Sequence, residues 1–217
     1  IIAFLFIAGF WLSQTPSGVQ GKADAVGYAI CHRIDERSFT TFGDRQLPMC
    51  ARCSGIYTGV MTGLLTIAAF GRLRATELPG IAVGLTLLGF VGVLGIDGLN
   101  SYFHLFPNFD DGLYQPNNTL RVTTGMFTGL TLIQGLLPIF NASVWRREAG
   151  LQDKAVRNFK ELAIYCAVII VVLGLILLNS PLINLIVGFA SAIGVLLVLS
   201  MVMAVMFMTF ARTDRTY

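Results

Sequence analysis

Five long apolar runs constrain this chain more than any other feature of its sequence. A helix needs about 20 mainly apolar residues to cross the hydrocarbon core of a bilayer. Runs near or above this length occupy residues 54–71, 79–98, 119–140, 160–179 and 182–211. Charged residues make up only 12% of the chain, whereas soluble domains carry roughly 25%. Together these features predict an all-α polytopic membrane protein.

A sixth apolar segment, residues 1–13, is too short to span a bilayer, and we interpret it as the later part of a first span. Residues 14–53 are then expected to form a polar loop that bears cysteine and histidine. Residues 54–211 would form the other five spans, and residues 212–217 a tail. The chain is thus predicted to be a single transmembrane domain of about six helices. Its net charge of +3 is too small to indicate nucleic-acid binding, so the lipid bilayer is its expected partner.

The distribution of basic residues predicts the orientation of these spans. Cytoplasmic loops of membrane proteins are enriched in Lys and Arg. Two predicted loops and the tail are basic here, and they carry Arg72, Arg74, Arg146, Arg147, Lys154, Arg157, Lys160, Arg212 and Arg215. Residues 99–118 contain no Lys or Arg. We therefore predict cytoplasmic termini and an extracytoplasmic loop at residues 14–53, where five basic residues are offset by four acidic ones.

Three of the four cysteines lie in that loop, and their spacing is typical of a metal site. Cys50 and Cys53 form a Cys-x-x-Cys turn, and Cys31 precedes His32. Zinc sites use such turns to present two thiolates, with further ligands from elsewhere in the chain. The fourth ligand could be His32, His104 or water. We predict a zinc site that is structural rather than catalytic, because closed sulfur-rich zinc sites are usually structural. A disulfide is the alternative on an oxidising outer face.

A second polar cluster is expected at the same end of the spans. Asp97 ends one predicted span, and Asn118 and Arg121 open the next. Charged groups at membrane depth are usually paired, so we expect an ion pair between Asp97 and Arg121. These residues would form either a polar pocket beneath the cysteine loop or an ion pair that fixes helix packing. The aromatic residues of the intervening loop are interpreted as interfacial anchors, and they are Tyr102, Phe103, Phe106, Phe109 and Tyr114.

Glycines spaced four residues apart open two of the predicted spans. Gly55 and Gly59 lie in one, and Gly125 and Gly129 lie in the other. Small residues at this spacing line one face of a helix and let another backbone approach closely. We therefore predict that these two helices pack together at the centre of the domain. Their similar openings also suggest a parallel duplication.

Two groups of motifs together resemble an uncharacterised family of small prokaryotic "predicted membrane proteins". The first group is Cys31-His32-Arg33, Arg37-Ser38-Phe39, Cys50-Ala51-Arg52-Cys53 and Gly55-Ile56-Tyr57, and the second is Asp97-Gly98, Asn118-Thr119-Leu120-Arg121 and Thr124-Gly125. The resemblance covers roughly the first two-thirds of the chain. The aromatic insertion at 101–117 is longer than the family's usual pattern. The resemblance implies a protein of the prokaryotic cytoplasmic membrane in which both clusters form one site, and it implies no reaction.

Three hypotheses about function follow, and they leave open whether the chain is an enzyme. The first is a protein with a structural zinc site that acts as an accessory or assembly subunit among other membrane protein subunits. The second is a membrane thiol-disulfide oxidoreductase that uses Cys50 and Cys53 to pass electrons to a quinone. The third is a metal-dependent membrane hydrolase or transporter, with Asp97, His104 and Arg121 around its substrate.

Overall fold

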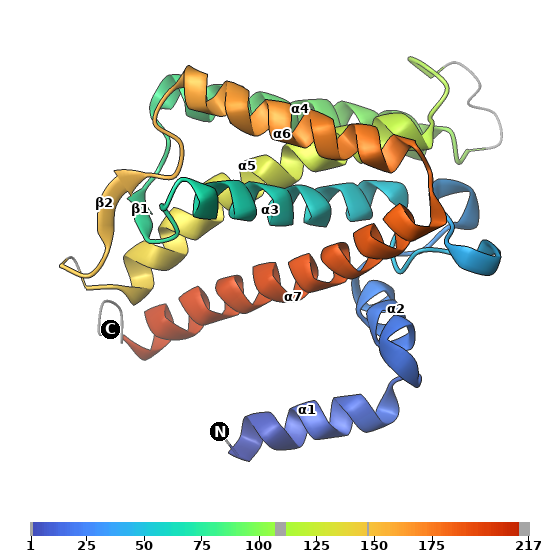
Figure 1. Ribbon diagram of the computed structural model, residues 1–217, viewed down its shortest axis with the longest axis horizontal. Coiled ribbons are helices and arrows are strands. Elements are labelled where there is room, and N and C mark those ends of the chain that lie inside the picture. The colour runs from blue at the N-terminus through green and yellow to red at the C-terminus, as the bar shows by residue number, and fades with distance from the viewer. Residues whose placement is uncertain (1, 107–111, 147, 213–217) are drawn as a thin grey trace.

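The computed structural model describes residues 2–106, 112–146 and 148–212 (Figure 1). Within these residues the chain is mostly helical. Its helices are α1 (Ile2–Gln14), α2 (Gly18–Ile30), α3 (Ala51–Ala69), α4 (Ile81–Phe103), α5 (Asn118–Val144), α6 (Phe159–Leu177) and α7 (Pro181–Ala211). Two short 3-10 turns, η1 (Asp35–Arg37) and η2 (Phe42–Asp44), precede α3. Two short strands, β1 (Ala75–Glu77) and β2 (Leu151–Lys154), pair in parallel, a small addition to the all-α fold expected from the sequence. Phe109, Arg147 and Arg215, named above, lie outside the described residues.

Four of the described helices, α4 to α7, are long and apolar enough to cross a membrane. The expected number of six spans is therefore not supported. Helix α1 has only 13 residues. Helix α3 has 19 residues but is not among the four. It lies in the middle of the bundle and packs against α5, α6 and α7 (Figure 1). Because neighbouring helices cover much of α3, its surface needs less apolar character than a lipid-facing helix does.

The prediction that residues 14–53 form only a loop was incomplete, because α2 occupies part of this segment. Helix α2 buries small residues, including Ala23 and Gly27, and packs against α7. A Cβ atom on Gly27 would lie 1.8 Å from the carbonyl oxygen of Pro48. The absence of a side chain at this position thus lets the chain that leads into α3 cross α2 closely. Helix α2 thereby places its C-terminal end beside the start of α3.

The predicted packing of the two glycine-bearing helices is confirmed. Helices α3 and α5 run in the same direction (Figure 1) and approach closely at two levels. A Cβ atom on Gly55 would lie 2.5 Å from the carbonyl oxygen of Val122, and one on Gly125 would lie 2.5 Å from that of Arg52. The same reciprocal relationship recurs one turn later, between Gly59 and Met126 and between Gly129 and Ile56. This local symmetry supports the suggested duplication, which remains a prediction.

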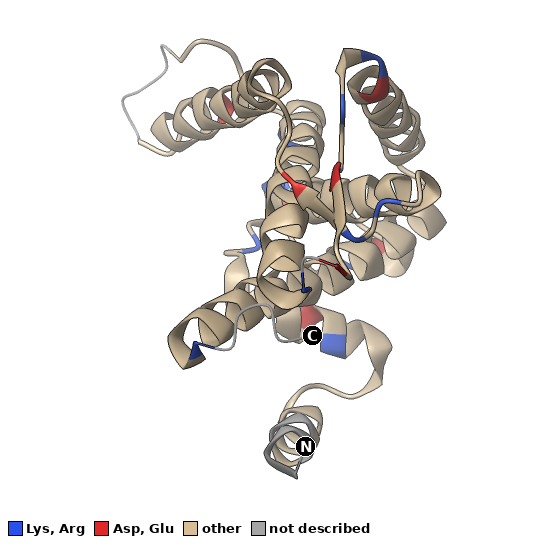
Figure 2. Cartoon of the chain, turned by 90° about the vertical axis from the view of Figure 1, so that its left-hand side faces the viewer, with Lys and Arg blue, Asp and Glu red and all other residues tan. Residues whose placement is uncertain are grey.

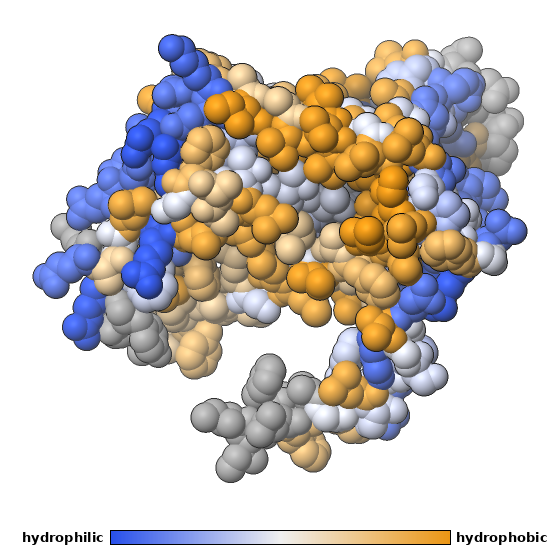
Figure 3. All heavy atoms as spheres, viewed as in Figure 1, coloured by the Kyte–Doolittle hydropathy of each residue, from blue (hydrophilic) through white to orange (hydrophobic). Residues whose placement is uncertain are grey.

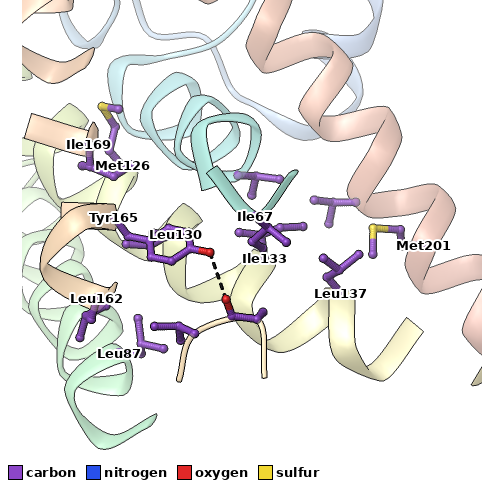
Figure 4. Close-up of a cluster of buried hydrophobic side chains, with 14 of the residues drawn as sticks. Ile67, Leu87, Met126, Leu130, Ile133, Leu137, Leu162, Tyr165, Ile169 and Met201 are labelled. Carbon is purple, nitrogen blue, oxygen red and sulfur yellow. Dashed lines mark hydrogen bonds between the residues drawn. The ribbon is translucent and has the colours of Figure 1, made fainter. Parts of the chain in front are cut away.

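The interior of the bundle is apolar around this helix pair. Ile67, Leu130, Ile133 and Ile169 are fully buried, and Tyr165 joins them with its hydroxyl donating to the carbonyl oxygen of Ala155 at 3.0 Å (Figure 4). Figure 3 shows apolar surface over the middle of the molecule and hydrophilic surface at both ends. A broad exposed apolar face is expected of a protein that lies in lipid.

The end of the bundle that holds β1 and β2 is charged (Figure 2). Arg72 donates to both carboxylate oxygens of Glu161, at 2.7 and 2.9 Å, and its Nε lies 3.6 Å from Asp153. These bonds join the end of α3 to β2 and to the start of α6. The opposite end, where α3 and α5 begin, holds Cys31, Cys50 and Cys53.

Candidate metal centre

Three cysteines converge where α2 ends and α3 begins. Cys31 directly follows α2, Cys50 precedes the first residue of α3, and Cys53 lies in the first turn of α3. Their Sγ atoms all lie within 4.8 Å of one another. The backbone N–H of Cys50 donates to the Sγ of Cys31 at 3.3 Å. The start of a helix also favours negative charge, which suits thiolate ligands.

The three thiols are sheltered and are not joined in disulfides. Cys31 and Cys50 are buried, and Cys53 is partly exposed. Hydrogen bonds from the thiols of Cys50 and Cys53 lower the pKa of Cys31, while the bond that the Cys50 thiol makes to Cys31 raises the pKa of Cys50. Only one negative charge is therefore favoured when the thiols are alone. A divalent cation would offset the repulsion between three thiolates, so the donor set fits a thiophilic metal such as zinc.

Neither histidine belongs to this group of three sulfurs. Cys31 has extended backbone angles, and successive side chains of an extended chain point in opposite directions. His32 is accordingly exposed. His104 follows α4, and its Nδ1 lies 2.8 Å from the carbonyl oxygen of Asn100. Its Nε2 is buried without a hydrogen-bond partner among the described residues. The fourth ligand, whether His32, His104 or water, remains a prediction.

The expected ion pair between Asp97 and Arg121 is wrong, because Arg52 pairs with Asp97 instead. Asp97 is only 1% exposed. The Nε of Arg52 donates to Oδ2 of Asp97 at 3.2 Å, and its Nη2 contacts the same oxygen. The hydroxyl of Tyr114 donates to the other carboxylate oxygen at 2.8 Å. Arg121 donates from Nη1 to Oδ1 of Asn118 at 3.0 Å.

Arg52 was missed as the partner of Asp97 because it is 45 residues away and lies within the cysteine motif. The close approach of α3 and α5 at Gly125 places the first turn of α3 against α5, and from there Arg52 reaches α4. The only sequence signal was the position of Arg52 between two cysteines at the start of a helix. The two polar clusters therefore share the first turn of α3.

The chain that connects α2 to α3 is tied to the bundle by polar contacts. The side-chain amide of Asn118 donates to the carbonyl oxygens of Glu36 and Ser38, at 3.3 and 3.5 Å. The amide of Gln46 donates to the Ser38 hydroxyl at 2.8 Å and to the carbonyl oxygen of Arg33 at 2.9 Å. Asn118 thus joins the cysteine-bearing segment to the start of α5, in the same region as Arg121.

Comparisons with known proteins agree with this picture of a membrane protein. An uncharacterized protein of Methanocaldococcus jannaschii is 31% identical over 126 residues, which cover 57% of this chain and 71% of the relative. An uncharacterized protein of Methanothermobacter thermautotrophicus is 34% identical over 103 residues, which cover 48% of this chain and 80% of the relative. No solved structure matches. The sequence pattern of one family matches residues 31–134, a range that includes all three clustered cysteines, Asp97 and Arg121. The chain belongs to that family, which is described as "Predicted membrane protein (DUF2085)".

Proposed function

We propose that this membrane protein binds one zinc ion through Cys31, Cys50 and Cys53, and that the ion has a structural role. The observation that carries the proposal is the convergence of three sulfur atoms from two separate segments within 4.8 Å. Zinc with thiolate ligands at about 2.3 Å places the sulfurs about 3.8 Å apart in a tetrahedral site. A small shift of the side chains would therefore complete three corners of that tetrahedron.

The ion would join the end of α2 to the start of α3. Helix α2 buries Val26 and three small residues on the side that packs against α7 and Pro48, and its Asp24 pairs with Arg33 and Arg45. Such a segment has little apolar core of its own, so metal binding would contribute directly to its folding. We further propose that the protein acts as an accessory or assembly subunit of a membrane complex, with the zinc-fixed segment presented at the membrane surface.

We also propose that this surface is extracytoplasmic. Basic residues gather at the opposite end of the bundle, near β1, β2 and the C-terminal end of α7, and they include Arg72, Arg74, Lys154, Arg157 and Arg212. Positive residues favour the cytoplasmic side. Two fusions after residue 217 test the orientation, one to green fluorescent protein and one to alkaline phosphatase. Fluorescence of the first places that end in the cytoplasm and supports the proposal. Enzymatic activity of the second places that end outside and contradicts it.

Elemental analysis of the detergent-purified, tag-free protein tests the metal centre. We expect one zinc per chain in the natural sequence. The variants Cys50→Ser and Cys53→Ser should lose the zinc and accumulate at lower levels in the membrane. Cys166→Ser is the matched control, because Cys166 lies within α6, outside the group of three sulfurs. Protein without metal, or a stable and abundant Cys50→Ser/Cys53→Ser double variant, would overturn the structural role.

The second candidate function is a thiol-disulfide oxidoreductase, and the partly exposed thiol of Cys53 beside Cys50 favours it. Oxidation of the two thiols to a disulfide would release two protons and two electrons, which would reduce a quinone to a quinol. Maleimide labelling before and after addition of quinone distinguishes the two functions. Loss of two labelled thiols on oxidation supports the oxidoreductase, whereas zinc-protected thiols support the structural centre. No contact in the described residues specifically favours the hydrolase or transporter hypothesis.

A further inference from the structure

Three arginines converge at the end of the bundle that holds the cysteines. Nη2 of Arg37, from η1, donates to the carbonyl oxygen of Ser101 at 3.1 Å. Nη2 of Arg52, from α3, donates to the hydroxyl of the same residue at 3.1 Å. Arg121, from α5, is bonded to Asn118, whose amide contacts the carbonyl oxygens on either side of Arg37. We call Arg37, Arg52 and Arg121 the arginine triad.

The positive charge of the triad is only partly neutralised. Asp97 is engaged by Arg52 and Tyr114. Among the residues that the structure describes, neither Arg37 nor Arg121 forms an ion pair with a carboxylate. Of the three guanidinium groups, only that of Arg52 is therefore paired with a carboxylate in the part of the chain that the structure describes.

Arg121 is the member of the triad whose state is hardest to explain without a ligand. Arg121 is only 6% exposed. Its Nε is buried and has no hydrogen-bond partner in the described part of the chain. An unpaired charge and an unsatisfied donor are both costly in a low-dielectric environment. An anion that accepts from this Nε would remove both penalties.

Two helix N-termini point to the same kind of ligand. Helices α3 and α5 run in the same direction and begin at the same end of the bundle (Figure 1). Arg52 and Arg121 both lie in the first turn of their helices. The positive ends of the helix dipoles thus add to the charge of the guanidinium groups.

We propose that the arginine triad binds a phosphate-type oxyanion. Arg37 and Arg121 would donate to its oxygens, and Asp97 and Ser101 would hold Arg52 in place beside it. Guanidinium groups suit this ligand because their planar donors match the spacing of phosphate oxygens. The anion could be the headgroup of an acidic phospholipid or a soluble phosphate, since the site lies at a hydrophilic end of the bundle (Figure 3). The proposal does not depend on the zinc centre.

Thermal unfolding of the full-length protein tests this site with two probes. The first is inorganic phosphate added to the protein in detergent, compared with chloride at equal ionic strength. The second is reconstitution into nanodiscs of phosphatidylcholine alone or mixed with phosphatidylglycerol. We expect saturable stabilisation by one of the probes. The variant Arg37→Gln should raise the concentration of phosphate or phosphatidylglycerol needed for half-maximal stabilisation by about tenfold or more, because it removes a charged donor to the anion. Arg45→Gln is the matched control, because Arg45 pairs with Asp24 outside the triad.

The two probes separate the possible sources of the anion. Stabilisation by phosphate that is lost in Arg37→Gln but kept in Arg45→Gln identifies a soluble phosphate. Stabilisation only by phosphatidylglycerol, with the same pattern of variants, identifies a lipid headgroup. Equal responses of the natural protein, Arg37→Gln and Arg45→Gln to both probes would overturn the proposal. Arg37 is partly exposed, so its replacement disturbs folding less than replacement of the buried Arg121 would. Unchanged zinc content in Arg37→Gln shows that any loss is specific to the triad.

Discussion

The carbonyl oxygen of Ile56 lies 1.9 Å from the position that a Cβ atom would occupy on Gly129. No real Cβ atom can lie this close to an oxygen, so α3 and α5 can keep their spacing only while residue 129 is glycine. Helix association in membranes depends on such close packing, because lipid removes the hydrophobic drive between helices. The contact is therefore a principal support of the bundle.

The substitution Gly129→Ala should accordingly destabilise the protein by about 2 kcal/mol or more, because the methyl group forces two backbones apart. Gly135→Ala is the matched control on the same helix, because nothing lies within 4 Å of a Cβ atom there. Its effect should be neutral, or stabilising by up to about 1 kcal/mol through helix propensity. Equilibrium unfolding in mixed detergent micelles measures both values, and equal stabilities of the two variants would contradict the packing argument.

The pairing of Asp97 with Arg52 predicts a specific pattern of energetic coupling. Asp97→Asn should destabilise the protein by about 2 kcal/mol, because it leaves the Arg52 charge without its partner. This loss of stability is smaller than for a fully buried ion pair, because the Arg52 side chain is 21% exposed and solvent screens its charge. Double-mutant cycles should give about 1 kcal/mol or more of coupling between Asp97 and Arg52. A larger coupling between Asp97 and Arg121 would restore the pairing expected from the sequence.

The parts of the fold that could be predicted from the sequence are those with a repeating pattern. Long apolar runs indicated α4 to α7, and the glycine spacing indicated the contact between α3 and α5. The cysteine spacing indicated the group of three sulfurs. Helix α2 was missed because it packs through small residues such as Ala23 and Gly27 rather than through an apolar stripe.

The partner of Asp97 was missed for a different reason. An ion pair between separate helices depends on how closely the helices approach and on which side chain reaches across. The close approach of α3 to α5 at Gly125 makes Arg52 the arginine that pairs with Asp97. Sequence order alone favoured Arg121, because it opens the span that follows Asp97. In the same way, the exposure of His32 depends on the extended backbone at Cys31.

Tyr114 should make the protein sensitive to alkaline pH. The pKa of Tyr114 is raised from an ordinary value of 10.0 to about 12, mainly by burial and to a smaller extent by the hydrogen bond to Asp97. A raised pKa in the folded state means that the contribution to stability is fully present below pH 10.0 and is lost as pH rises towards about 12. Unfolding midpoints measured across this range should fall more steeply for the natural protein than for Tyr114→Phe. The difference in phenolate absorbance between the two proteins should appear near pH 12; its appearance at pH 10 would show that the hydroxyl is free.

Removal of the metal should loosen one part of the molecule and leave the rest intact. The proposed zinc ion joins Cys31, after α2, to Cys50 and Cys53, at the start of α3, whereas the contact between α3 and α5 involves no cysteine. Chelation should therefore speed amide hydrogen exchange in α2 and in residues 31–50 by about tenfold or more, because local opening loses the binding energy of the ion. Exchange in the middle of α5 should change little.

Cys31→Ser tests the same coupling without a chelator. It should reproduce the faster exchange in α2 in the absence of any treatment, and added chelator should then have no further effect on that segment. Cys166→Ser should exchange like the natural protein and should respond to chelator in the same way, because Cys166 is outside the group of three sulfurs. If chelation accelerates exchange uniformly along α2, α3 and α5, the ion stabilises the whole bundle rather than one junction. If it accelerates exchange nowhere, the cysteines do not hold a structural metal, and the oxidoreductase becomes the better account of the three thiols.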